Sequence, residues 1–109
     1  MKSLSDVFPP PNELLMLEPE EIAVFLLDYL CELEINKQTG LLNRYNFTLD
    51  SNITGYSGAN INKQVGKVIM EAWVWLENEG MIAPKPGESD SPWIFVTRKG
   101  YKVRKSADW

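Results

Sequence analysis

The chain has 109 residues, of which 44% are hydrophobic and 24% are charged, and these values suit one globular domain with one core. It contains no histidine and a single cysteine, Cys31, which excludes the commonest general base, the commonest transition-metal ligand and an internal disulfide. The net charge of −4 argues against nucleic acid as a partner, but the charge is unevenly distributed. Residues 1–60 are acidic, with nine acids and three bases, and residues 61–109 are basic, with six acids and eight bases.

From these exclusions we expect a binding module and not an enzyme, with no catalytic residues, no metal, no cofactor and no small-molecule substrate. No apolar run approaches the roughly 20 residues that span a bilayer, and residues 1–6 lack the apolar stretch of a secretory signal. We therefore expect a cytoplasmic protein without membrane contact, and a lone cysteine suits that compartment.

Residues 1–17 are predicted to form an extended arm. The triplet Pro9-Pro10-Pro11 favours polyproline geometry over a helix. The apolar run 14–17 is too hydrophobic to stay in water, so we expect the arm to pack onto the domain or onto a second copy of it.

The first predicted helix runs from about Pro19 to Leu33, because Pro19, Glu20 and Glu21 suit a first helical turn. Apolar residues recur at spacings of three and four along one stripe, which consists of Ile22, Phe25, Leu26, Tyr29, Leu30 and Leu33. Cys31 lies among apolar residues, and we interpret it as a small buried hydrophobe.

Residues 41–59 have the weakest pattern, with a possible short helix over 41–47 followed by loop residues. A long helix follows from about Asn60 or Ile61 to Asn78, and Gly80 stands where a helix C-terminus favours glycine. On a helical wheel its inner face comprises Ile61, Val65, Val68, Ile69, Ala72 and Leu76. The opposite face carries Lys63, Lys67, Met70 and Val74, with Trp73 and Trp75 on the flanks.

A β-hairpin is predicted after Gly80, with strands at about 81–84 and 92–98 joined by a turn-rich loop. Gly100 is expected to end the hairpin, and residues 101–105 to form a basic closing segment. The predicted core comprises Phe25, Leu26, Leu30, Val65, Ile69, Ala72, Leu76 and Ile82, together with Ile94 or Phe95.

Two segments resemble winged helix-turn-helix domains: WLENEGMI, from Trp75 to Ile82, resembles the end of their third helix, and FVTRKG, from Phe95 to Gly100, resembles the close of their wing. The stretch EAWVWLENEGMIAPKPG, with WIFVTRKG after it, also resembles the N-terminal module of a poorly characterised group of bacterial hypothetical proteins. The resemblance covers about residues 17–104. It implies an α+β winged-helix fold of three helices and a two- or three-stranded sheet. We accordingly divide the chain into an arm at 1–17, the winged-helix domain at 18–105 and a C-terminal tail at 106–109.

Double-stranded DNA is the partner that we rank first, because the C-terminal segment is basic and many domains of this fold bind DNA. Lys63, Gln64 and Lys67, with Asn60, could face a major groove. The candidate phosphate contacts of the C-terminal segment are Arg98, Lys99 and Lys102, together with Arg104 and Lys105.

A protein partner or a homodimer is the alternative. The acidic first helix, the apolar outer face of the long helix, and Glu88 and Asp90 at the hairpin tip favour it. The candidate interface residues are Met70, Trp73, Val74, Leu14 and Leu15. In the competing account the arm folds over the outer face of the long helix and leaves a monomer, and Trp75 and Trp93 are expected in the core.

Overall fold

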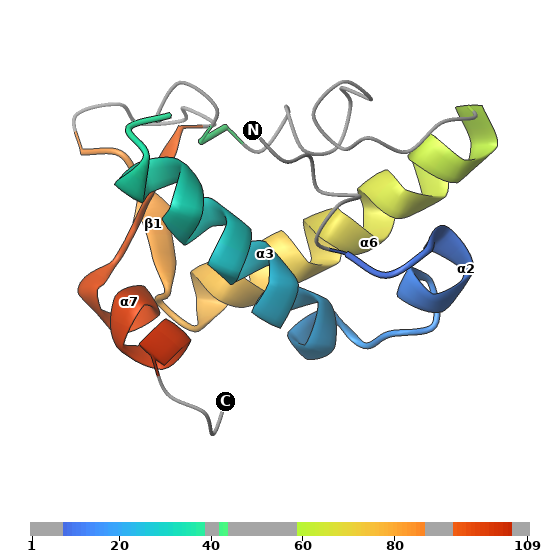
Figure 1. Ribbon diagram of the computed structural model, residues 1–109, viewed down its shortest axis with the longest axis horizontal. Helices are drawn as coiled ribbons and strands as arrows, with labels where there is room; N and C mark the ends of the chain where they lie inside the picture. The colour runs from blue at the N-terminus through green and yellow to red at the C-terminus, as the bar shows by residue number, and fades with distance from the viewer. Residues whose placement is uncertain (1–7, 39–41, 44–58, 87–92, 106–109) are drawn as a thin grey trace.

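The computed structural model describes residues 8–38, 42–43, 59–86 and 93–105, and in the second long helix it describes side chains from residue 63 onward (Figure 1). These residues form an α+β arrangement of four helices and a two-stranded antiparallel sheet, which confirms the predicted α+β class. In chain order the elements are α2 (Pro11–Leu14), α3 (Pro19–Ile35), α6 (Ala59–Asn78), β1 (Ile82–Pro84), β2 (Ile94–Val96) and α7 (Arg98–Lys105).

The two long helices, α3 and α6, pack against each other at the centre of the molecule. The short α2 lies at one end of this pair, and the β-hairpin lies with α7 at the other end (Figure 1). Both long helices were predicted, and their observed ends fall within two residues of the predicted ones.

The core lies between α3 and α6 and extends under the hairpin. The predicted core residues Leu26, Leu30, Val65, Ile69, Ala72, Leu76 and Ile82 are all buried. Of the two alternatives in the second strand, Ile94 is buried and Phe95 is exposed. Successive side chains of a strand point to opposite faces, so only one of these two neighbours can face the core.

Phe25 was predicted to be in the core, and this is wrong, since 36% of its surface is exposed. Its ring instead packs edge-on against Phe8, with the ring centroids 5.9 Å apart. The buried face of α3 is rotated toward Ala23, Leu27 and Cys31, because α6, α7 and β2 all pack against this helix. Phe25 is left at the edge of that wider face.

Both long helices end in the same hydrogen-bonded motif, with a residue in the left-handed region after the last turn. After α3 this residue is Lys37, with φ 60°, and the Gln38 N–H donates to the Leu33 carbonyl at 2.7 Å. After α6 it is Gly80, with φ 72°, and the Met81 N–H donates to the Leu76 carbonyl at 3.0 Å. The predicted role of Gly80 is therefore confirmed.

The arm is not wholly extended, because Pro11–Leu14 form the short helix α2. Pro10 keeps polyproline geometry (φ −55°, ψ 154°), whereas Pro11 takes the first helical position, where a missing N–H costs nothing. Phe8 and Leu14 are buried in the same core as α3 and α6. Of the two expectations for the arm, packing onto its own chain is the one observed.

The predicted hairpin is confirmed, with Ile82 opposite Val96, Ala83 opposite Phe95 and Pro84 opposite Ile94. A further antiparallel bridge joins Asn43 to Trp93, and the Ile94 N–H donates to the Leu42 carbonyl at 3.1 Å. The chain at residues 42–43 is therefore paired to the hairpin and is not part of a helix. The rest of the possible helix over 41–47, and the loop after it, lie outside the described residues apart from the start of α6.

Residues 98–105 form the helix α7, so the prediction that Gly100 ends the hairpin is wrong, and the predicted basic closing segment 101–105 is the second half of this helix. Thr97 starts this helix, because its Oγ1 accepts the Gly100 N–H at 3.1 Å and donates to the Gly80 carbonyl at 2.6 Å. Gly100 lies inside α7, where a Cβ would meet the Met81 carbonyl oxygen and stand 2.8 Å from Val96 Cγ1. Its role is close packing of α7 against the hairpin.

Candidate binding surfaces

The outer face of α6 carries the candidate DNA contacts Lys63, Gln64 and Lys67, and all three are exposed. Val74 lies two turns beyond Lys67 on the same side of the helix and is 45% exposed. Met70 is half-buried against the core. This face is therefore basic in its first half and partly apolar in its second half. The side chain of Asn60 lies outside the described residues.

Two of the candidate interface residues are not available to a partner. Trp73 and Leu14 are completely buried, so the structure places them in the core and not at an interface. Trp73 was predicted on the flank of α6, but the buried side of this helix is broad enough to include it. Leu15 is half-buried, and the apolar surface left on the outer face of α6 consists of Val74 and part of Met70. Trp75 and Trp93, expected in the core, are both half-buried.

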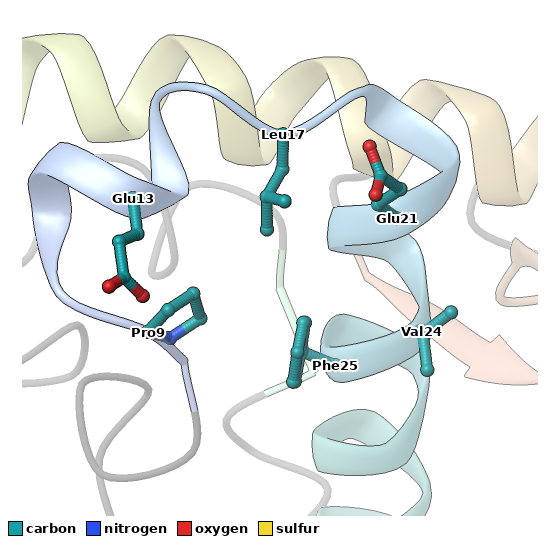
Figure 2. Close-up of a pocket in the computed structure, with 6 residues that line it drawn as sticks. All are labelled: Pro9, Glu13, Leu17, Glu21, Val24 and Phe25. Atoms are coloured by element: carbon teal, nitrogen blue, oxygen red, sulfur yellow. The ribbon is translucent and has the colours of Figure 1, made fainter.

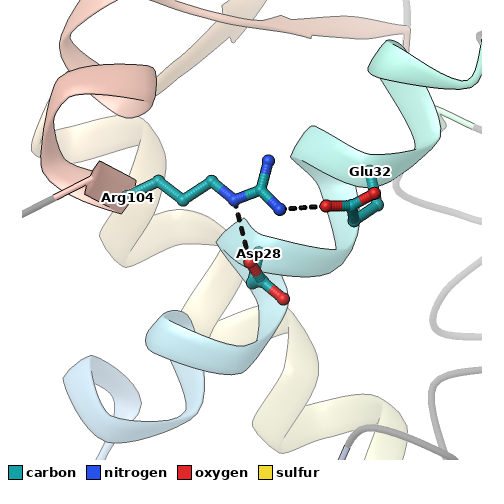
Figure 3. Close-up of polar contacts among 3 residues, drawn as sticks. All are labelled: Asp28, Glu32 and Arg104. Atoms are coloured by element: carbon teal, nitrogen blue, oxygen red, sulfur yellow. Dashed lines mark hydrogen bonds and ion pairs between the residues drawn. The ribbon is translucent and has the colours of Figure 1, made fainter.

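The basic residues of α7 are partly engaged within the chain. Arg104 is 23% exposed and reaches across to α3, where its Nε donates to Asp28 Oδ1 at 2.8 Å and its Nη2 donates to Glu32 Oε1 (Figure 3). The Lys99 ammonium donates to the Glu79 carbonyl just after the end of α6. Arg98 and Lys102 are exposed, as is Lys105.

The two groups of candidate DNA contacts lie at opposite ends of α6. Lys99 contacts Glu79 after its C-terminus, whereas Lys63 lies 16 positions earlier in the chain. At 1.5 Å per helical residue this separation is about 24 Å. Figure 1 shows α7 beside the C-terminal end of α6 and away from its N-terminal half. The fold does not bring the sequence-predicted cations together into one surface.

Glu34 of α3 joins three elements at the centre of this end of the molecule. Its carboxylate accepts the Val96 N–H at 3.2 Å and the Tyr101 hydroxyl. The pKa of Tyr101 is raised well above its ordinary value, mainly by burial and secondly by the hydrogen bond to Glu34. Burial also raises the pKa of the Cys31 thiol to about 11, so this cysteine is a protonated core residue at neutral pH.

A groove between α2 and α3 is the feature that sequence reasoning missed. It has a volume of about 460 Å³ and is lined by Pro9, Glu13, Leu17, Glu21, Val24 and Phe25. Figure 2 shows Leu17 and Phe25 pointing into the space between the two helices, with Glu13 on the α2 side and Glu21 on the α3 side. A sequence signal existed, because residues 8–36 contain seven carboxylates and no basic residue.

None of the described residues forms a group of three or more potential metal ligands. The same part of the chain contains no helix that is both long and apolar enough to cross a bilayer. Comparison of the chain with protein-family models, with curated proteins and with solved structures finds no significant match.

Proposed function

We propose that this chain is a winged-helix module whose partner is a protein and not duplex DNA. The observation that carries the proposal is the placement of charge. The cations that would have to contact phosphates stand in two groups, because Glu79, which Lys99 contacts, lies about 18 Å from Lys67 and about 24 Å from Lys63 along α6. Arg104 is already neutralised by Asp28 and Glu32, and the face formed by α2 and α3 is acidic. Proteins that bind duplex DNA usually gather their lysine and arginine residues into one basic patch or stripe.

The order of the described elements supports the winged-helix part of the proposal. A helix is followed by the extended residues 42–43, a long helix and a β-hairpin. Residues 42–43 pair with the second strand of the hairpin, which gives a strand order with β2 in the middle. In a winged helix the turn and second helix would fall between residue 43 and α6.

DNA binding remains a second candidate because of one observation. Lys63, Gln64 and Lys67 are exposed together in the first half of α6, and the N-terminal part of a recognition helix is the part that contacts bases in helix-turn-helix domains. Among the described residues neither lysine forms an ion pair.

Fluorescence anisotropy with labelled duplexes of random and mixed genomic sequence, at about 20 mM salt, separates the two candidates. We expect no saturable binding below about 100 μM, because nonspecific duplex binding depends on the number of phosphates that a surface neutralises. Binding that is lost in Lys63→Gln/Lys67→Gln and kept in the charge-matched Arg98→Gln/Lys102→Gln would establish α6 as a DNA-reading helix and overturn our proposal.

A further inference from the structure

The groove between α2 and α3 exposes apolar surface at a defined place. Its apolar lining comes from Pro9, Leu17, Val24 and Phe25. The Phe25 ring is held on one edge by Phe8, so it presents a fixed aromatic surface to the groove. The groove has a volume of about 460 Å³, which is enough for a bulky apolar side chain.

The charge around this groove is of one sign. Of the seven carboxylates between residues 8 and 36, Asp28 and Glu32 are paired with Arg104, and Glu34 is hydrogen-bonded by Tyr101. The other four, Glu13, Glu18, Glu20 and Glu21, form no ion pair among the described residues and are all exposed. Glu13 and Glu21 line the groove from two different helices, so a cation bound between them would be attracted from both sides.

We infer that this groove binds a segment of another protein in which a bulky apolar side chain lies between lysine or arginine residues. The apolar side chain would cover Phe25 and Leu17, and the flanking cations would meet Glu13 and Glu21. The inference rests on the proposed protein-binding function and names the site and the chemistry of the partner. Apolar contact supplies the affinity here, and the two carboxylates select for basic flanks.

Other occupants fit the charge less well. Phosphates of nucleic acid and anionic lipid headgroups would be repelled by the exposed carboxylates of Glu13, Glu18, Glu20 and Glu21. The basic helix α7 of the same chain is held at the other end of α6, by the contacts of Lys99 with Glu79 and of Arg104 with Asp28.

The test uses the full chain and a fluorescein-labelled, amidated 12-residue peptide, with a central leucine flanked on each side by lysine and arginine. We expect saturable binding that weakens about tenfold in Glu13→Gln/Glu21→Gln, since the variant removes two exposed ion pairs and each contributes about threefold to the affinity. Glutamine at position 21 keeps the acceptor for the Glu18 N–H, which Glu21 Oε1 accepts at 3.0 Å, so this variant should fold normally. The charge-matched control Glu71→Gln/Glu79→Gln lies on and just after α6 and should bind like the unaltered chain.

Two peptide controls complete the experiment. Replacing the cations by glutamine, or the leucine by serine, should each weaken binding markedly. Equal weakening in both double variants would show nonspecific charge attraction, and absence of binding up to about 1 mM peptide would exclude such a ligand; either result overturns the inference. Neither result bears on the broader protein-binding function. That function is overturned by the anisotropy experiment, if the chain binds duplex DNA and loses this binding in Lys63→Gln/Lys67→Gln.

Discussion

At the scale of single residues, two glycines near the hairpin are needed for different physical reasons. Gly80 has φ 72°, and nothing lies within 4 Å of the place where a Cβ would stand, so only the backbone conformation resists a side chain. Gly100 lies in α7, and there a Cβ would overlap the Met81 carbonyl and Val96. One position requires conformational freedom and the other requires space.

This contrast predicts different responses to alanine and asparagine. Gly80→Ala should cost about 1–2 kcal/mol, and Gly80→Asn less, because asparagine tolerates the left-handed region. Gly100→Ala should cost about 1–3 kcal/mol through overpacking, and Gly100→Asn more. Urea denaturation of the four variants measures these differences. A Gly100→Asn chain as stable as the original would show that α7 does not pack so closely on Met81 and Val96 of the hairpin.

The exposure of Phe25 and the burial of Leu76 lead to a second prediction. Leu76→Ala should cost about 2–5 kcal/mol, the range for a fully buried leucine. Phe25→Ala should cost less than this despite removing a larger side chain, because 36% of Phe25 is already in water. Denaturation midpoints compare the two variants directly. If Phe25→Ala lost more stability than Leu76→Ala, Phe25 would belong to the core, as the sequence pattern predicted.

At the scale of elements, α7 is held onto α3 by a polar cluster. The Tyr101 hydroxyl donates to Glu34, and Arg104 pairs with Asp28 and Glu32. Cys31 is buried on the same helix, and the charges of Arg104 and Asp28 act on its thiol. Docking of α7 therefore depends on Tyr101 keeping the proton that it donates to Glu34, while burial of Cys31 favours the protonated thiol in the folded core.

This dependence predicts a loss of stability at alkaline pH. The pKa of Cys31 is raised from 9.0 to about 11, and that of Tyr101 is raised from 10.0, so above pH 9 the unfolded chain binds fewer protons than the folded chain. The free energy of unfolding should fall as the pH rises from 9 to 11. Tyr101→Phe should be less stable at pH 7, because Glu34 loses a donor, but should show a shallower alkaline decline. Urea titrations at each pH measure the free energy of unfolding of both chains. If this free energy fell with pH as steeply in Tyr101→Phe as in the original chain, the account would be contradicted.

The sequence predicts the elements that carry a strong local signal and misses those that depend on distant contacts. The apolar period gives α3 and α6, and the change of composition after Gly80 gives the hairpin. Helix α7 is missed because its residues have no apolar stripe strong enough to predict it, although Thr97 is a good helix-capping residue. The groove is missed because its residues come from two helices whose packing no local pattern records.

The candidate cations illustrate the same limit. Arg104 looks like a phosphate contact in the sequence, but in the fold it meets Asp28, which is 76 positions away. Lys63, Gln64 and Lys67 can be predicted to be exposed because they share one face of a helix. Whether two basic segments join into one surface depends on tertiary packing, and here they do not.

At the scale of the whole molecule, the charge is divided between an acidic face on α2 and α3 and separate cations at the ends of α6. Over residues 8–38, 42–43, 59–86 and 93–105, the burial of Trp73 and Leu14 leaves little apolar surface for a symmetric dimer. The exposed apolar residues that remain are scattered over several elements and include Met16, Phe25, Ile35, Val74 and Phe95. This distribution favours a different protein as partner over a second copy of the chain.

Sedimentation velocity tests this preference. We expect a monomer at about 100 μM, because α2 packs onto its own α6 and covers apolar surface that a partner copy would otherwise use. The control is Val74→Glu, which should sediment like the original chain. A dimer that Val74→Glu dissociates without unfolding would instead make a second copy the partner and place the interface on α6.

The central claim, that the binding face is the acidic groove and not the basic half of α6, is tested most directly by nuclear magnetic resonance. The labelled chain is titrated at low salt with the basic leucine peptide and, in parallel, with a random-sequence duplex. The account predicts that the peptide shifts the backbone amides of Leu17, Val24 and Phe25, while the duplex leaves those of Lys63, Gln64 and Lys67 in place. Duplex-dependent shifts confined to these three amides, with the groove unaffected by the peptide, would contradict it.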